Sequence, residues 1–320
     1  MRIVILGYTG LIGNSILEYL FENTSFAIIC VGRNTKIKPF KNKRINYFKW
    51  NFKSFKKTNK FNFNKEDIII NCVGKINDDK YKTNNINVIF LKKLLQHINS
   101  NKIKVRIIHL SSVAVYGGSN IKIGKNKVFT EQSKERANDI YSRSKIEGDS
   151  LIQNVIKKGL NKNFSYTIFR ISNVFGGAQK SNLFKYVIFT LKNGLWIKCY
   201  DDITFNFVNI NDVVQAIILS ITKLNVSKNK TYIVSDDCKQ KQIYNKYKII
   251  SKRSFFKVQI PIQLLKFLIF LFPFPKKIFN FFSIISCRIS YSNKKIKKEL
   301  KFKPMFSLYK KIKLLNGQKN

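Results

Sequence analysis

Short apolar runs alternate along the chain with longer segments in which apolar residues recur every three or four positions. The runs predict buried strands at residues 3–6, 26–31, 45–48, 67–73, 105–111, 166–171 and 231–234. The longer segments predict helices at residues 12–20, 85–99, 141–157, 180–193 and 211–224, the last of them capped by Asn211 or Asp212. This alternation is typical of an α/β protein with a doubly wound parallel sheet and right-handed crossovers.

The first strand runs straight into a glycine-rich turn, GYTGLIG at residues 7–13, and then into the first helix. Gly7 allows a tight turn, Gly10 lets a pyrophosphate approach the backbone, and Gly13 lets the helix pack against the sheet. The helix N-terminus then presents amide groups and a positive dipole end to the phosphates. An ordinary glycine-rich turn is the alternative. We interpret the motif as a Rossmann-type dinucleotide site built from Gly7, Thr9, Gly10, Leu11, Ile12 and Gly13.

Three further residues bear on the cofactor. About twenty residues beyond the last glycine, an acid selects the ribose hydroxyl of NAD, whereas an arginine accommodates the phosphate of NADP. Arg33 stands there, which favours NADP over NAD, although it is also one cation among many. Val73 and Gly74 end the strand at residues 67–73 and are expected to lie under the cofactor.

The regular pattern loosens after Gly176 and Gly177. We therefore predict an NAD(P)-binding Rossmann domain at residues 1–175 and a smaller C-terminal substrate lobe at residues 176–320. The segment 205–235 is expected to return to the first domain.

Charge is the unusual feature of the composition: the 320 residues carry a formal net charge of +43. Such a balance suggests nucleic acid or an acidic surface as partner. The lysines, however, are spread almost evenly, as a biased base composition of the coding sequence would produce. No basic helix or tail gathers them, and no aromatic residues alternate with them as a stacking platform requires. We therefore expect no nucleic-acid partner; the charge still attracts an anionic nucleotide.

The five cysteines are scattered without CxxC spacing and are interpreted as reduced thiols of a cytoplasmic protein, with no metal site. His109 lies in an apolar strand and is expected to be a core residue. The N-terminus lacks the pattern of a signal peptide.

The segment 260–285 is very apolar. A membrane-spanning helix needs about 20 uninterrupted apolar residues. Lys266, Lys276 and Lys277 interrupt this run, and Pro273 and Pro275 break a helix. We predict amphipathic helices packed on the substrate lobe, with peripheral membrane contact as the alternative.

Hydroxyl and amine groups follow the strand at residues 105–111. Ser111 and Ser112 stand at its carboxyl end, which faces the ligand crevice in open α/β sheets. Tyr141 and Lys145 share a helix face downstream. A lysine ammonium beside a phenol is expected to lower the phenol pKa and so favour a general base. The same spacing recurs by chance at Tyr244/Lys248, Tyr291/Lys295 and Tyr309/Lys313.

Together these motifs resemble the extended short-chain dehydrogenase/reductases, specifically the NAD-dependent epimerase/dehydratase family of nucleotide-sugar enzymes. The similarity covers nearly the whole chain. It rests on GYTGLIG (7–13), SSVAVYG (111–117), YSRSK (141–145), FRISNVFG (169–176), FNFVNINDVVQAI (205–217) and SNKKIKKELKFKP (292–304).

The resemblance implies a catalytic Ser112, Tyr141 and Lys145. Tyr141 takes a proton from a sugar hydroxyl while the nicotinamide takes the hydride, Ser112 hydrogen-bonds the same oxygen, and Lys145 also holds the nicotinamide ribose. A nucleotide-diphosphate sugar is the implied substrate, contacted by Asn87, Ser111 and Asn173, and a homodimer is the implied assembly.

The reaction stays open between a C4 epimerase, which returns the hydride, and an NADPH-dependent 4-keto-sugar reductase. Either would serve surface polysaccharide synthesis. A 4,6-dehydratase is disfavoured because Val113 and Ala114 stand where that branch carries an Asp-Glu pair. A non-catalytic dinucleotide-binding protein is the further alternative.

Overall fold

The main feature of the computed structural model is a sheet of seven parallel strands. In spatial order these are β12 (Lys230–Val234), β7 (Phe164–Ile171), β5 (Val105–Ser112), β4 (Asp67–Asn71), β1 (Arg2–Leu6), β2 (Ala27–Gly32) and β3 (Ile45–Lys49). The predicted doubly wound α/β fold is confirmed. The structure describes residues 1–33, 37–50, 62–75, 83–117, 126–177, 182–200, 203–271, 286, 288–306 and 308.

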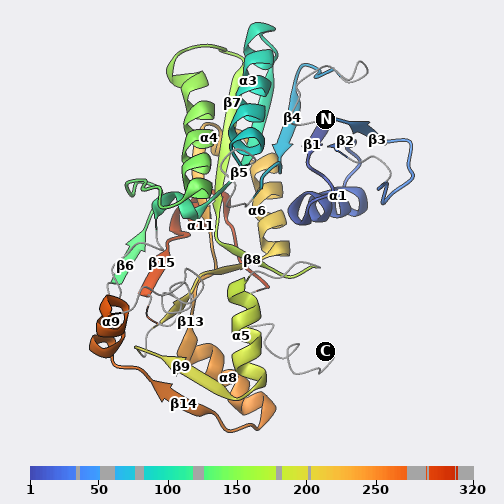
Figure 1. Cartoon of the computed structure of the whole chain (residues 1–320). Coiled ribbons are helices and arrows are strands. Elements are labelled where there is room, and N and C mark those ends of the chain that lie inside the picture. Colours follow the sequence, from blue (N-terminus) through green and yellow to red (C-terminus); the bar gives the residue numbers. More distant parts are fainter. Residues whose placement is uncertain are drawn as a thin grey trace.

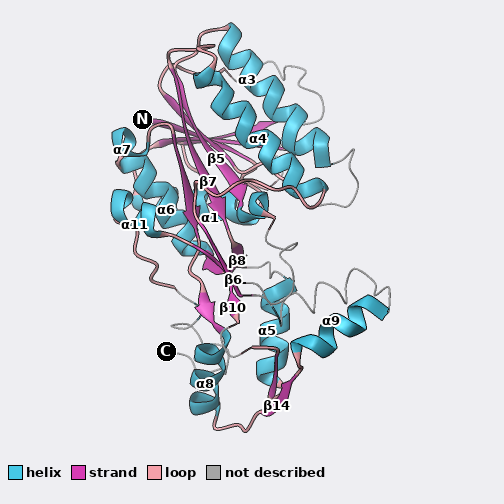
Figure 2. Cartoon of the chain, turned by 90° about the vertical axis from the view of Figure 1, so that its left-hand side faces the viewer, coloured by secondary structure: helices cyan, strands magenta, loops and turns pink. Residues whose placement is uncertain are grey.

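Helices cover both faces of this sheet (Figure 2). Side chains of β1 alternate between the two layers, since Ile3 and Ile5 pack into one buried cluster and Val4 and Leu6 into the other. The first cluster contains apolar residues of α1 (Leu11–Asn23), α6 (Ile210–Thr222) and α11 (Lys294–Leu300). The second contains those of α3 (Phe90–Ser100) and α4 (Ile140–Lys157).

Two helix starts differ from the sequence prediction. The predicted helix at residues 85–99 opens with a π-helical turn, η1 (Asn85–Ile89), before α3. The predicted cap of α6 is wrong: Asn209 caps the helix by accepting a hydrogen bond from the Asn211 amide. Asp212 is fully buried instead, where its carboxylate accepts a hydrogen bond from the Met305 amide. It therefore ties α6 to the segment that follows α11.

The smaller lobe lies below the sheet in the view of Figure 1. It has its own buried aromatic cluster, which includes Phe184, Trp196 and Tyr244. Its elements are α5 (Asn182–Lys192), β9 (Leu195–Lys198), α8 (Gln240–Ser251), β14 (Phe256–Gln259) and α9 (Ile262–Leu271). Small pairings join the lobes: β8 (Asn173–Phe175) with β11 (Phe207–Asn209), β10 (Thr204–Phe205) with β13 (Cys238–Lys239), and β6 (Asn126–Phe129) with β15 (Arg288–Tyr291). Two further short helices lie in the described part of the chain, η2 (Val113–Tyr116) and α7 (Leu224–Ser227).

Within the predicted apolar segment, α9 is the described helix, and residues 272–285 lie outside the described residues. In the part of the chain that the structure describes, no helix has the length and apolar character to cross a membrane. Four cysteines are free thiols, Cys30, Cys72, Cys199 and Cys238, and Cys287 lies outside the described residues.

Candidate active site

The strand order reverses between β1 and β4, and this switch point is where open α/β sheets bind ligands. The loops that follow the two strands touch there. Gly7 has φ +82°, and a Cβ on it would stand 3.2 Å from the Val73 amide nitrogen. Gly7 is therefore required both by its left-handed backbone and by the close approach of the β4 loop.

The glycine loop has the shape that a dinucleotide pyrophosphate needs. Gly10 caps α1 without a side-chain hydrogen bond, and the amides of a first helical turn have no acceptor within the helix. A Cβ on Gly10 would meet only the Gly7 carbonyl oxygen, at 3.4 Å, so the space beside Gly10 is open to a ligand. Gly177 packs against Leu11 at the rim, where an added Cβ would lie 2.8 Å from the leucine Cδ1. The loop fits the dinucleotide predicted for it.

Gly10 and Gly13 are expected to fail in different ways when they are replaced. A Cβ on Gly13 would lie 2.4 Å from the Gly7 carbonyl oxygen and 2.9 Å from the Tyr8 Cα, both backbone atoms. Gly13→Ala is therefore expected to lower the free energy of unfolding by about 1–3 kcal/mol. Gly10→Val is expected to fold and to lose dinucleotide affinity by at least about tenfold, because its side chain fills the phosphate position.

Denaturant melts and fluorescence titration with NADH and NADPH measure the two effects. Normal dinucleotide affinity in a folded Gly10→Val variant would contradict the loop assignment.

Arg33 and Gly74 lie at the carboxyl edge of the sheet, as expected for cofactor contacts. Arg33 directly follows β2 and is exposed. Gly74 follows β4 and is exposed too, whereas Val73 is buried and donates its amide to the Asn71 side chain at 3.1 Å. A Cβ on Gly74 would stand 3.3 Å from the Lys145 Nζ, so the β4 loop and the predicted catalytic lysine meet.

Ser112 and Tyr141 meet because a strand end and a helix start converge. Ser112 ends β5, and its hydroxyl accepts a hydrogen bond from the Ala114 amide at 3.2 Å. A capping box between Asp139 and Ser142 sets the start of α4, directly around Tyr141. Burial raises the pKa of Tyr141 to about 12, and a hydrogen bond with Ser112 opposes that rise.

Lys145 lies one turn along α4 and is 6% exposed. Its Nζ donates to the Leu110 carbonyl oxygen at 2.9 Å and stands 5.8 Å from the centre of the Tyr141 ring. Burial lowers the pKa of Lys145 to about 8, with Asp149 opposing. The prediction that Lys145 lowers the Tyr141 pKa is wrong for this structure: burial dominates at the phenol, and the ammonium is directed to the β5 backbone.

The predicted substrate residues differ in how they are held. The Asn87 amide has three protein partners: it accepts from the Lys75 amide at 2.8 Å and donates to the Lys75 carbonyl and to the Ser144 hydroxyl. It thereby joins the β4 loop to α4 from within the π-helical turn. Ser111 is 5% exposed, whereas Asn173 is exposed and donates to the Asn206 carbonyl. Their contacts with a substrate stay a prediction.

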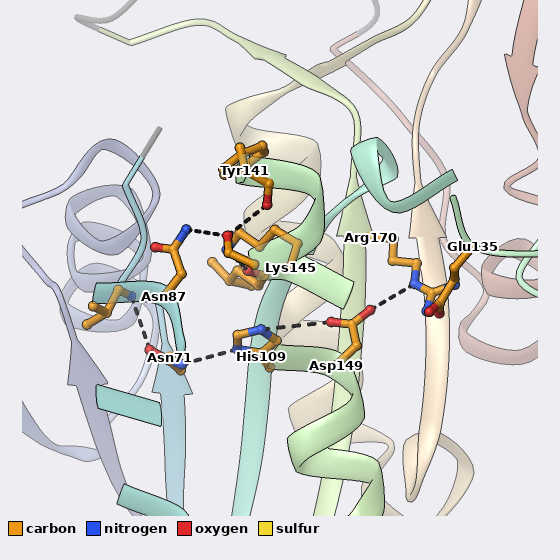
Figure 3. Close-up of polar contacts among 11 residues, drawn as sticks. Asn71, Asn87, His109, Glu135, Tyr141, Lys145, Asp149 and Arg170 are labelled. Carbon is orange, nitrogen blue, oxygen red and sulfur yellow. Dashed lines mark hydrogen bonds and ion pairs between the residues drawn. The ribbon is translucent and has the colours of Figure 1, made fainter. Parts of the chain in front are cut away.

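A buried polar row crosses the sheet behind Lys145 (Figure 3). It starts at Asn71, whose amide lies 3.1 Å from the His109 Nδ1. The His109 Nε2 stands 3.9 Å from the Asp149 carboxylate, which accepts from the Arg170 Nε at 3.0 Å. The Arg170 guanidinium also donates to Glu135.

His109 is 2% exposed, which fits the core position expected for it, and burial lowers its pKa well below the usual value. The row itself was missed by the sequence interpretation. The available signal was Asp149, four residues after Lys145 and so on the same helix face. Its charge sits close enough to oppose the lowering of the Lys145 pKa.

Comparison with known proteins agrees with this fold. The family model described as the NAD-dependent epimerase/dehydratase family matches residues 3–235. A UDP-glucuronic acid 4-epimerase from Bacillus cereus, solved with NAD, superimposes with a TM-score of 0.69 at 16% identity, covering 99% of this chain and 96% of that one. Among curated proteins, the sequence search finds no match.

Two further solved structures extend the likeness. RMD from Pseudomonas aeruginosa, complexed with NADPH, gives a TM-score of 0.67 at 15% identity, with 99% and 98% of the two chains covered. A UDP-glucose 4-epimerase from Thermotoga maritima, solved with UDP-glucose, gives 0.66 at 18% identity with the same coverage.

The fold and the strand-end site thus define a Rossmann-type α/β protein of the short-chain dehydrogenase/reductase class. Within that class, the chain belongs to the NAD-dependent epimerase/dehydratase family. The resemblance inferred from the sequence motifs is confirmed.

Proposed function

We propose that this protein is an NAD(P)-dependent nucleotide-sugar C4 epimerase that acts through Ser112, Tyr141 and Lys145. The observation that carries the proposal is the convergence of these three groups at the carboxyl edge of the sheet, beside the glycine loop. The cofactor would be held by the first turn of α1, by the β4 loop at Val73 and Gly74, and by Lys145. When bound, the nicotinamide supplies the hydride acceptor.

The chain's own residues have distinct tasks in this proposal. Tyr141 exchanges a proton with the C4 oxygen of the sugar, while the Ser112 hydroxyl orients that oxygen. The ammonium of Lys145, held against the Leu110 carbonyl, lies between the β4 loop and the phenol. The substrate would be a nucleotide-diphosphate sugar, which the excess of cations in this chain attracts. In this proposal the protein acts as a homodimer in the cytoplasm and supplies nucleotide sugars for surface polysaccharide synthesis.

A second candidate is an NADPH-dependent 4-keto-sugar-nucleotide reductase. It is favoured by the exposed Arg33 at the end of β2, in the position that reads the adenosine ribose. It is also favoured by the likeness to a structure complexed with NADPH. Both candidate reactions use the Tyr141 hydroxyl for proton transfer. They differ in the hydride transfer: the epimerase returns the hydride to the sugar that gave it, whereas the reductase stops after a single transfer from NADPH.

The test follows the hydrogen at C4. The purified protein is first stripped of bound nucleotide and titrated with NADH and NADPH by fluorescence. The stripped protein is then loaded with NAD⁺ or NADP⁺, which accepts the hydride, and incubated with UDP-glucose and UDP-glucuronic acid that carry deuterium at C4. An epimerase forms the C4 epimer with the deuterium retained and no net change in cofactor.

Stoichiometric consumption of NADPH on a 4-keto-sugar nucleotide would instead establish the reductase. If the protein binds neither NADH nor NADPH, both candidate functions are overturned. The alternative of a non-catalytic dinucleotide-binding protein is then contradicted as well.

A further inference from the structure

The smaller lobe presents an apolar helix face to solvent. On α9, Leu264, Phe267 and Leu271 are 48%, 56% and 49% exposed, and Leu268 between them is half-buried. These positions follow i, i+3, i+4 and i+7, so they form one stripe along the helix. The neighbouring Leu265 is fully buried against Cys199 and anchors the opposite side of the helix. The stripe therefore points outward from a helix that is attached to the lobe.

An ordinary surface helix turns its apolar side chains toward the protein core, whereas α9 turns an apolar stripe toward solvent. In α6 the apolar residues Val213, Ala216 and Ile217 are buried against the sheet. In α9 a stripe of comparable character is turned away from the lobe, and Phe256 on the adjacent strand β14 is 71% exposed. Contiguous exposed apolar side chains mark an interaction surface. Figures 1 and 2 show α9 and β14 at the end of the molecule that is remote from the seven-stranded sheet.

The stretch of sequence that contains the stripe carries charge of one sign. Lysines are spread along the whole chain, but acidic residues are not: between Asp237 and Glu299 there are fifteen lysines and arginines and no Asp or Glu. Exposed cations of this segment include Lys248 on α8, Lys252 and Arg253 after it, and Lys257 on β14. The outward apolar stripe thus lies within a stretch of sequence whose charged residues are all cations.

From this juxtaposition we propose that the α9 face docks on an anionic phospholipid membrane. An interfacial helix inserts its apolar side chains at the boundary of headgroups and acyl chains, while lysines and arginines contact the anionic headgroups. Leu264, Phe267 and Leu271 are the inserted side chains. The candidate active site lies at the carboxyl edge of the main sheet and contains none of these side chains.

Charge complementarity decides against two other occupants. A second copy of this face would bring two acid-free cationic segments together, which like charges oppose. A nucleic acid would meet the cations, but its phosphates gain nothing from burying Leu264 and Leu271. An anionic lipid surface satisfies both the charge and the apolar stripe.

The test is sedimentation of the full chain with lipid vesicles. Wild-type protein is expected to sediment with vesicles of equal parts phosphatidylglycerol and phosphatidylcholine and to stay in solution with phosphatidylcholine alone. Added salt is expected to weaken the binding because it screens the charges. The triple variant Leu264→Gln, Phe267→Gln, Leu271→Gln is expected to lower the vesicle partition coefficient by at least about tenfold.

A matched control separates this face from exposed apolar residues in general. Val128 and Leu160 are 58% and 45% exposed on other parts of the molecule, and the double variant Val128→Gln, Leu160→Gln is expected to bind as wild type does. The thermal melting midpoint shows whether each variant is folded. The single variant Phe267→Gln replaces the triple one where that midpoint falls.

Three results would overturn the proposal. In the first, wild-type protein fails to sediment with the anionic vesicles at low salt. In the second, the folded triple variant binds as tightly as wild type, so that charge alone causes the adsorption. In the third, the triple substitution abolishes self-association or RNA binding while vesicle binding stays as in wild type.

Discussion

Tyr141→Phe is expected to lower turnover by about 10²- to 10⁴-fold, because it removes the phenolic proton that the proposed reaction exchanges with the sugar oxygen. The ring stays, and its packing at the start of α4 is unchanged, so the fold and the affinity for dinucleotide are expected to persist. Steady-state rates with nucleotide sugars and fluorescence titration with NADH and NADPH measure the two quantities. Turnover like that of wild type in this variant would eliminate the proposed mechanism.

Tyr291→Phe is the matched control. Tyr291 and Lys295 have the same spacing as Tyr141 and Lys145, but the Tyr291 ring stacks on Phe129 and lies beside Tyr116. Its loss of a hydroxyl is expected to leave turnover unchanged. A comparable loss of activity in both variants would show that removal of a tyrosine hydroxyl has a general effect. It would then contradict a specific role of Tyr141 in proton transfer.

Arg170→Met is expected to reduce the free energy of unfolding by about 3–5 kcal/mol, the largest stability effect among the charged pairs described. The Arg170 side chain is 3% exposed and that of Asp149 is 1% exposed, so the substitution leaves a buried carboxylate without its cation. Burial already raises the pKa of Asp149, and Arg170 opposes that rise. Urea titration followed by circular dichroism measures the change.

Two controls accompany this variant. Lys104→Met breaks the exposed pair with Glu66 and is expected to leave the midpoint of unfolding unchanged. The double variant Asp149→Asn, Arg170→Met removes both charges and is expected to recover part of the lost stability. A double variant that is less stable than Arg170→Met would contradict this explanation. The loss of stability would then not come from an unpaired Asp149 carboxylate.

The features predicted well from the sequence are local ones. The turn at residues 7–13 requires glycine because Gly7 has a left-handed backbone and Gly13 lies against Gly7, and both requirements arise within a few residues. Buried parallel strands are nearly continuous apolar runs, so their positions were also readable. The strand order β12-β7-β5-β4-β1-β2-β3 was not predicted, because the rule of right-handed crossovers limits the possible orders without selecting one.

What escaped prediction depends on residues far apart in the sequence. The row from Asn71 through His109 and Asp149 to Arg170 joins β4, β5, α4 and β7, and no single segment reveals it. The pKa of Tyr141 was predicted from its spacing to Lys145, whereas burial by the surrounding chain determines the direction. The cap of α6 was misplaced because three polar residues stand together at 209, 211 and 212, and packing of Asp212 on the C-terminal segment decides among them.

The pairing of β12 with β7 constrains how such a protein can diversify. The edge strand β12 and the helices α6 and α11 pack in the main sheet domain but follow α5 and β9 of the smaller lobe in the sequence. The smaller lobe is therefore formed by two insertions into the sequence of the main sheet domain. One insertion separates β8 from β11, and the other separates β12 from β15. Substitutions or changes of length confined to these two inserts therefore leave the order and pairing of the seven strands intact, whereas a break in the chain at one junction would separate β12, α6 and α11 from the rest of the sheet.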